Sequence, residues 1–73
     1  MKKRAIEELI FENTKGRIMV KLQAEYFEDQ IQNTPSEEVK TSLMRLISEK
    51  LSLVHQYEVH INMLKKMLKE VER

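Results

Sequence analysis

Apolar side chains recur at alternating spacings of four and three residues through the second half of the chain. The positions are Leu43, Ile47, Val54, Tyr57, Ile61, Leu64, Leu68 and Val71, with Lys50 as the single polar interruption. This is the a/d pattern of a helix that buries one seam along its length against other helices. It predicts one long helix in the second half of the chain.

The start of this helix is marked by a segment rich in capping residues. Thr34 is a favourable cap, Pro35 suits the first helical position, and Glu37 follows Thr34 by three residues, as in a capping box. No Gly or Pro occurs after Pro35. We therefore expect a helix over residues 35–72, roughly 55 Å long at about 1.5 Å per residue.

The first half of the chain carries a second seam with the same spacing. Its apolar positions are Ile6, Ile10, Val20, Ala24, Phe27 and Ile31, with the polar residues Asn13 and Arg17 between them. We expect a helix over about residues 2–32 and a loop at 33–34, with the two helices antiparallel and Asn13 near Tyr57. The chain is thus predicted to be all-α, a single helical-hairpin domain over residues 1–73.

The segment around Gly16 leaves two alternatives open. Residues 13–16 can form a turn between two short strands, which gives a β-hairpin at residues 8–22. Gly16 can also end a short first helix, which gives a chain of three helices. We prefer a continuous helix, in which an internal glycine costs about 1 kcal/mol.

The second helix carries more apolar surface than one partner helix can cover. Its seam is flanked by Leu46, Leu53, His60 and Met67 on one side and by Met44 and Leu51 on the other. A chain of 73 residues without cysteine lacks both a large core and disulfides. We therefore expect a coiled-coil-like homodimer of two hairpins, a four-helix bundle. The expected bundle core is Leu43, Leu46, Ile47, Leu53, Val54, Tyr57, Ile61, Leu64 and Leu68.

The first helix has a further apolar strip, roughly opposite its seam. The strip consists of Phe11, Ile18, Met19, Leu22 and Tyr26. Apolar surface on two faces requires two partners, either within an oligomer or from another protein. Acidic residues near the loop lie beside this strip, and aromatic residues are favoured in interface hot spots. The strip, together with Glu25 and Asp29, is the candidate protein-binding site.

Basic residues gather at the two ends of the chain, although the net charge is only +1. An antiparallel hairpin brings them to one end of the molecule: Lys2, Lys3, Arg4, Lys65, Lys66 and Lys69. A basic end can contact phosphates, so binding of nucleic acid is an alternative function. Interspersed glutamates, among them Glu7 and Glu70, weaken that interpretation.

The sequence matches no catalytic or metal-binding pattern. His55 and His60 are five residues apart, about 140° around a helix, so they do not converge on one ion. A single Gly cannot form a glycine-rich phosphate loop, and the chain has no thiol nucleophile. We expect no catalytic, cofactor-binding or metal-binding residues.

These observations define the expected function and location. No apolar run approaches the roughly 18 residues of a membrane span, and the N-terminus does not have the pattern of a signal peptide. We expect a cytoplasmic, non-enzymatic, protein-binding regulator, adaptor or inhibitor that does not bind membranes. A nucleic-acid-binding regulator and a structural assembly subunit are the alternatives.

Overall fold

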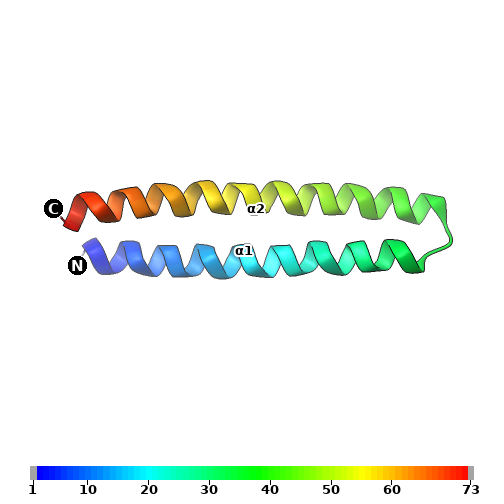
Figure 1. Ribbon diagram of the computed structural model, residues 1–73, viewed down its shortest axis with the longest axis horizontal. Helices are drawn as coiled ribbons and strands as arrows, with labels where there is room; N and C mark the ends of the chain where they lie inside the picture. The colour runs from blue at the N-terminus through cyan, green and yellow to red at the C-terminus, as the bar shows by residue number, and fades with distance from the viewer. Residues whose placement is uncertain (1, 73) are drawn as a thin grey trace.

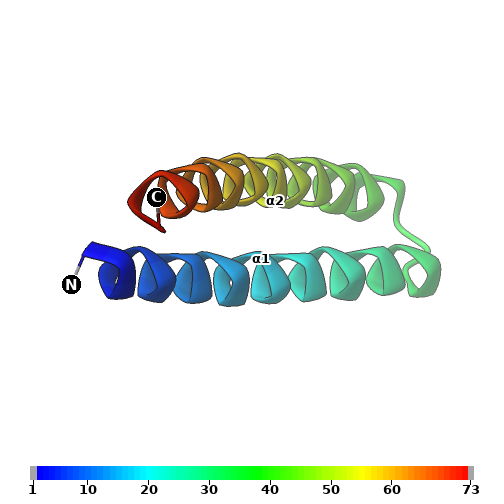
Figure 2. The ribbon, with the colours of Figure 1, turned by 60° about the vertical axis from the view of Figure 1, so that its left-hand side comes forward.

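The computed structural model describes residues 2–72 and shows two α-helices joined by a short loop (Figure 1). Helix α1 spans Lys2–Asn33 and helix α2 spans Glu37–Glu72. The helices run antiparallel and side by side in both views, so the first turn of α1 and the last turn of α2 lie at the same end of the rod (Figures 1 and 2). The Cα extents are 56 × 14 × 12 Å and the radius of gyration is 16.7 Å. A compact domain of this length has a radius of gyration of about 11 Å, so the hairpin has little interior.

The prediction of an all-α hairpin is confirmed, and both alternatives at Gly16 are wrong. Residues 2–72 contain no strand, and α1 continues through Gly16 without a break. The helix bounds differ from the expected ones by one residue at the end of α1 and by two residues at the start of α2.

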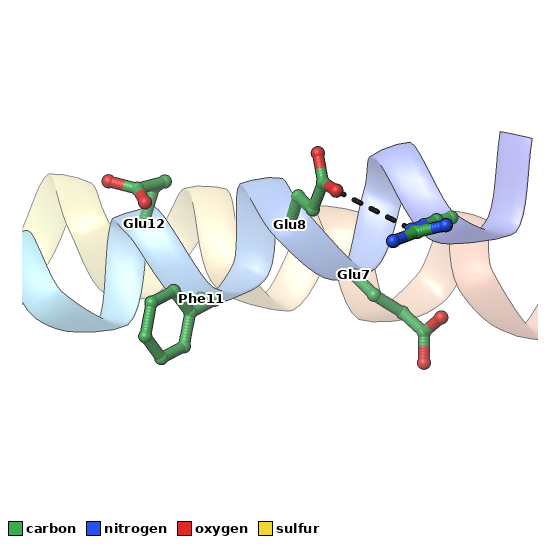
Figure 3. Close-up of a pocket in the computed structure, with 5 residues that line it drawn as sticks. Glu7, Glu8, Phe11 and Glu12 are labelled. Atoms are coloured by element: carbon green, nitrogen blue, oxygen red, sulfur yellow. Dashed lines mark ion pairs between the residues drawn. The ribbon is translucent and has the colours of Figure 1, made fainter.

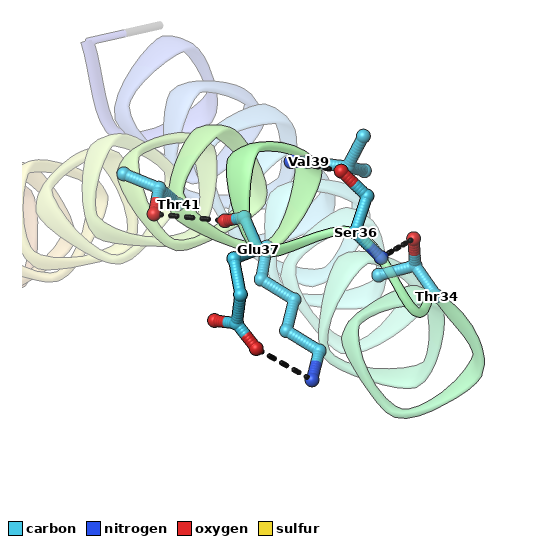
Figure 4. A network of polar contacts seen from close by, with 6 residues as sticks. Thr34, Ser36, Glu37, Val39 and Thr41 are labelled. Atoms are coloured by element: carbon cyan, nitrogen blue, oxygen red, sulfur yellow. Dashed lines mark hydrogen bonds and ion pairs between the residues drawn. The ribbon is translucent and has the colours of Figure 1, made fainter.

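Ser36 caps α2 in place of the expected Thr34 (Figure 4). The Ser36 Oγ accepts a hydrogen bond from the backbone N–H of Val39 at 3.3 Å. The Ser36 carbonyl accepts the first backbone bond of the helix, from the N–H of Lys40 at 3.0 Å. The predicted capping box is therefore wrong, because Glu37 is the first helical residue and not the third. Thr34 instead accepts a bond from the Ser36 N–H within the loop, at 3.4 Å.

The distance between the two helices explains why Ser36, and not Thr34, caps α2. Packed helices have axes about 8–10 Å apart, and three extended residues span about 10 Å, whereas two span only about 7 Å. A cap at Ser36 leaves residues 34–36 to make the crossing. It also places Glu37 and Glu38 in the first turn of α2, where the helix dipole favours negative charge.

The two predicted seams form the contact between the helices. Ile6 and Ala24 on α1 and Ile61 on α2 are buried. Every other seam position is half-buried except Val71, which is exposed near the end of α2. The two helices therefore pack along the predicted seams, but only three apolar side chains among the described residues are buried.

Gly16 has a packing role that the sequence pattern does not reveal. A Cβ atom at this position would lie 2.6 Å from the Cζ atom of Tyr57. The Tyr57 ring thus stands directly against the backbone of α1. Helical side chains lean toward the N-terminus of their own helix. Because α1 and α2 are antiparallel, this lean carries the Tyr57 ring toward the C-terminus of α1. The ring therefore contacts Gly16, which follows Asn13, the residue predicted to lie near Tyr57, by three positions.

The polar seam residue Asn13 is satisfied within its own helix. Its Nδ2 donates a hydrogen bond to the carbonyl of Leu9 at 2.8 Å. The Thr14 Oγ1 likewise donates to the carbonyl of Ile10 at 2.7 Å. These bonds hold the side chains along α1 and do not select a register between the helices.

Over residues 2–72, neither helix has a stretch long and apolar enough to cross a membrane.

Candidate protein-binding surfaces

The apolar strip of α1 lies on the outer surface of the hairpin, where α2 does not cover it. We call Phe11, Ile18, Met19, Leu22 and Tyr26 the α1 strip. The exposed fraction of its members ranges from 49% at Ile18 to 62% at Phe11. Glu25 and Asp29, the acidic residues assigned to the same site, are exposed as well. All seven predicted site residues therefore lie on solvent-accessible surface of the single hairpin.

Phe11 forms one end of the strip and is surrounded by charged side chains (Figure 3). It lines a shallow groove with four others: Arg4, Glu7, Glu8 and Glu12. In Figure 3 the Phe11 ring and Glu7 project to one side of α1, while Glu8 and Glu12 project to the other. The Lys15 ammonium lies 5.5 Å from the ring centroid, and the ion pair of Arg4 and Glu8 measures 3.7 Å. The ring is thus an apolar contact within a largely acidic border.

Tyr26 forms the other end of the strip, near the loop. Its ring packs edge-to-face on Phe27, with a centroid distance of 5.8 Å and an interplanar angle of 61°. Phe27 belongs to the half-buried seam, so the exposed Tyr26 ring is supported by the contact between the helices. Aromatic anchors that are held in place lose little entropy on binding, which makes them common hot spots.

A second apolar surface runs along one side of α2. We call Val39, Leu46, Leu53, His60 and Met67 the α2 flank; they follow one another at intervals of seven residues. Leu46 and Leu53, which we expected in the bundle core, are 37% and 39% exposed. The other seven expected core residues are buried or half-buried. A single hairpin thus covers seven of the nine predicted core residues at least in part and leaves the flank exposed.

The α2 flank is continuous with two further apolar residues, Leu9 of α1 and Met63 of α2. One groove beside the flank is lined by Leu9, Asn13, His60, Met63, Leu64 and Met67. A neighbouring groove is lined by Leu53, Gln56, Tyr57 and His60. Leu9 and Met63 lie outside both predicted seams, and only the antiparallel pairing brings them together.

The antiparallel pairing brings the two helix ends that carry the six basic residues to one end of the hairpin, as expected (Figure 1). All six are exposed. The Lys3 Nζ lies 3.6 Å from a carboxylate oxygen of Glu72, which links the ends of the two helices. Glu7 and Lys65 line the same groove. The end of the rod therefore carries mixed charge and not an uninterrupted basic patch.

The described residues contain no cluster of three or more His, Cys, Asp or Glu side chains that could hold a metal ion. His55 and His60 are both exposed. Comparisons with family models, with curated proteins and with solved structures find no match for this chain.

Proposed function

We propose that the protein is a small, non-enzymatic regulator that forms a homodimeric four-helix bundle and binds another protein through the α1 strip. The observation that carries this proposal is the exposure of five large apolar side chains on the outer face of α1. Exposed apolar patches of this kind are typical of interaction sites. The strip from Phe11 to Tyr26 covers about 22 Å of helix, which matches an amphipathic partner helix of about four turns.

The charges around the strip indicate the chemistry of the partner. Acidic residues border both ends of it: Glu7, Glu8 and Glu12 near Phe11, and Glu25, Glu28 and Asp29 near Tyr26. Two basic residues on this surface, Lys15 and Lys21, lie between these acidic groups along the chain, and a third, Arg4, is paired with Glu8. A partner with an apolar stripe and basic side chains at both ends of that stripe is complementary to this pattern.

The substitution Leu22→Glu tests the role of the strip. It places a charge at the centre of the strip without touching the seam, so the hairpin is expected to fold. We expect the proteins retained by the wild type in affinity capture from the native cell to be lost with Leu22→Glu. Binding of the purified partner is expected to weaken by at least about tenfold, because a carboxylate would be buried in an apolar contact.

The matched control is Ser52→Glu, which adds the same charge to the exposed outer face of α2. It is expected to retain the partner at wild-type affinity. Equal binding by wild type and Leu22→Glu would contradict the proposal, and so would equal loss of binding in both variants.

Binding of nucleic acid is the second candidate, supported by the six exposed basic residues on the two helix ends that the antiparallel pairing brings together. It requires an affinity for structured RNA or duplex DNA that falls steeply between about 50 and 200 mM salt. It also requires that Lys65→Glu with Lys66→Glu abolish this affinity. The glutamates at the same end favour the protein partner over this alternative.

A further inference from the structure

The exposed area of the hairpin is larger than a stable monomer of this size presents. The single chain exposes 5977 Å², whereas a folded monomer of 8.8 kDa exposes about 4,800 Å². The excess of roughly 1,200 Å² per chain is more than the ~800 Å² that each partner contributes to a standard interface. An association that covers this area removes the excess.

The two sides of the contact between α1 and α2 differ sharply in charge. On the side of the α2 flank, the positions next to the seam carry no Asp, Glu, Lys or Arg from residue 9 to residue 67. They are Leu9, Gly16, Gln23 and Gln30 on α1 and the five residues of the flank on α2. The opposite side carries the charged residues Glu7, Lys21, Glu28, Glu58 and Lys65 beside Thr14, Met44 and Leu51. Helix pairs that face water on both sides carry charges at both sets of positions, so the uncharged side is suited to burial.

The α2 flank is complementary to a second copy of itself. Its five residues are spaced symmetrically about Leu53 and extend for about 42 Å along α2. Antiparallel pairing about a two-fold axis at Leu53 sets Leu53 against Leu53, Leu46 against His60, and Val39 against Met67. A stripe with a spacing of seven residues stays in contact along its length when the helices cross at about 20°.

The α1 strip does not pair with itself in this way. An antiparallel two-fold that sets Phe11 against Tyr26 also brings Glu12 opposite Glu25 and Glu8 opposite Asp29. Like charges in direct opposition disfavour such an interface. Of the two exposed apolar surfaces, only the α2 flank is free of this conflict.

We propose that the α2 flank is the homodimer interface, where a second copy of this chain binds antiparallel about a two-fold axis at Leu53. This inference rests on the dimer of the proposed function and assigns its interface. The flank supplies the third apolar position that each heptad of a bundle helix needs beyond a and d. The α1 strip then stays on the outside of the bundle, free to bind a different protein.

Single cysteines test the interface directly, because the chain has none of its own. Leu53→Cys places two thiols face to face at the two-fold axis, whereas Leu22→Cys places them on the outside of the bundle. Both positions are exposed in the single hairpin, so neither change removes a buried side chain. We expect mild oxidation to convert most of Leu53→Cys to a disulfide-linked dimer that remains helical, and to leave Leu22→Cys largely uncrosslinked.

A charged pair of variants gives an independent measurement by sedimentation equilibrium. Leu53→Glu sets two carboxylates against each other at the axis, and we expect it to raise the dimer Kd by about 100-fold or more. The dimer Kd of Leu22→Glu is expected to stay within about threefold of the wild type.

The outcomes separate this inference from the proposed function. A monomeric wild type at about 100 µM, preferential crosslinking of Leu22→Cys, or equal crosslinking of both variants overturns the flank as the interface. If the flank dimer forms and Leu22→Glu still binds the partner, the interface stands and the binding role of the strip fails.

Discussion

Gly16 and Tyr57 form the contact on which the middle of the hairpin depends. An alanine at position 16 has better helix propensity by about 1 kcal/mol, but its Cβ would lie 2.6 Å from a ring carbon of Tyr57. Displacing the ring opens the seam at its centre. We therefore expect the gain in propensity to be outweighed by the cost of overpacking.

The substitution Gly16→Ala is predicted to lower the free energy of unfolding by about 1–3 kcal/mol. Urea denaturation at fixed protein concentration measures this change. The control Ser52→Ala, at an exposed position on the outer face of α2, is expected to be neutral or slightly stabilising. If Gly16→Ala stabilises the protein as Ser52→Ala does, the ring does not pack against the backbone as described.

This contact marks the limit of prediction from sequence at the scale of residues. The spacing of apolar residues predicted the seam positions, Tyr57 among them. Gly16 stood out in the sequence only as a possible break in the first helix. Their contact depends on the lean of the Tyr57 side chain and on the exact pairing of two helices. The heptad pattern alone contains neither quantity, so it did not predict the contact of the Tyr57 ring with Gly16.

At the scale of elements, the two helices follow from the seams, whereas the start of α2 depends on a choice between two nearby caps. Thr34 and Ser36 both have side chains that suit an N-cap. Local propensity does not separate them, because Pro35 and Glu37 fit the earlier start equally well. The distance between the helices favours the later cap, and that distance is a property of the folded hairpin.

The two caps predict different effects of removing each hydroxyl. Ser36→Ala loses the bond to the Val39 N–H and is expected to lower the free energy of unfolding by about 0.5–2 kcal/mol. Thr34→Ala loses a longer bond within the loop and should cost less. Thermal unfolding of the two variants measures the two losses of stability. A larger loss for Thr34→Ala than for Ser36→Ala would indicate that Thr34, and not Ser36, caps α2.

At the scale of the whole molecule, the hairpin has two exposed apolar surfaces with different charge borders. The α2 flank is uncharged and symmetric about Leu53, whereas the α1 strip is shorter and acidic at both ends. The sequence predicted the α1 strip and four of the five residues of the α2 flank, all but Val39, because these residues recur at helical spacings. It did not predict that Leu9 and Met63 extend the flank, since that requires the two helices to lie side by side.

His60 is the one polar residue of the α2 flank, and it offers a gain-of-affinity test of the dimer. The two-fold pairing sets His60 against Leu46, so His60→Leu adds apolar contact twice in each dimer. We expect the dimer Kd measured by sedimentation to fall by at least about tenfold. His55→Leu makes the same change at an exposed position away from the flank and should leave the Kd unchanged. Equal effects of the two variants would mean that hydrophobicity alone drives association.

In the proposed assembly, the α2 flank forms the dimer and the α1 strip binds a different protein. The native mass of Leu22→Glu in sedimentation equilibrium tests this arrangement most directly. If the α2 flank holds the dimer and the α1 strip is left for a partner, this variant sediments as a helical dimer of twice 8.8 kDa, like the wild type. A dimeric wild type with a monomeric Leu22→Glu would show that the α1 strip is the dimer interface, and would contradict both its role in binding a partner and the two-fold axis at Leu53.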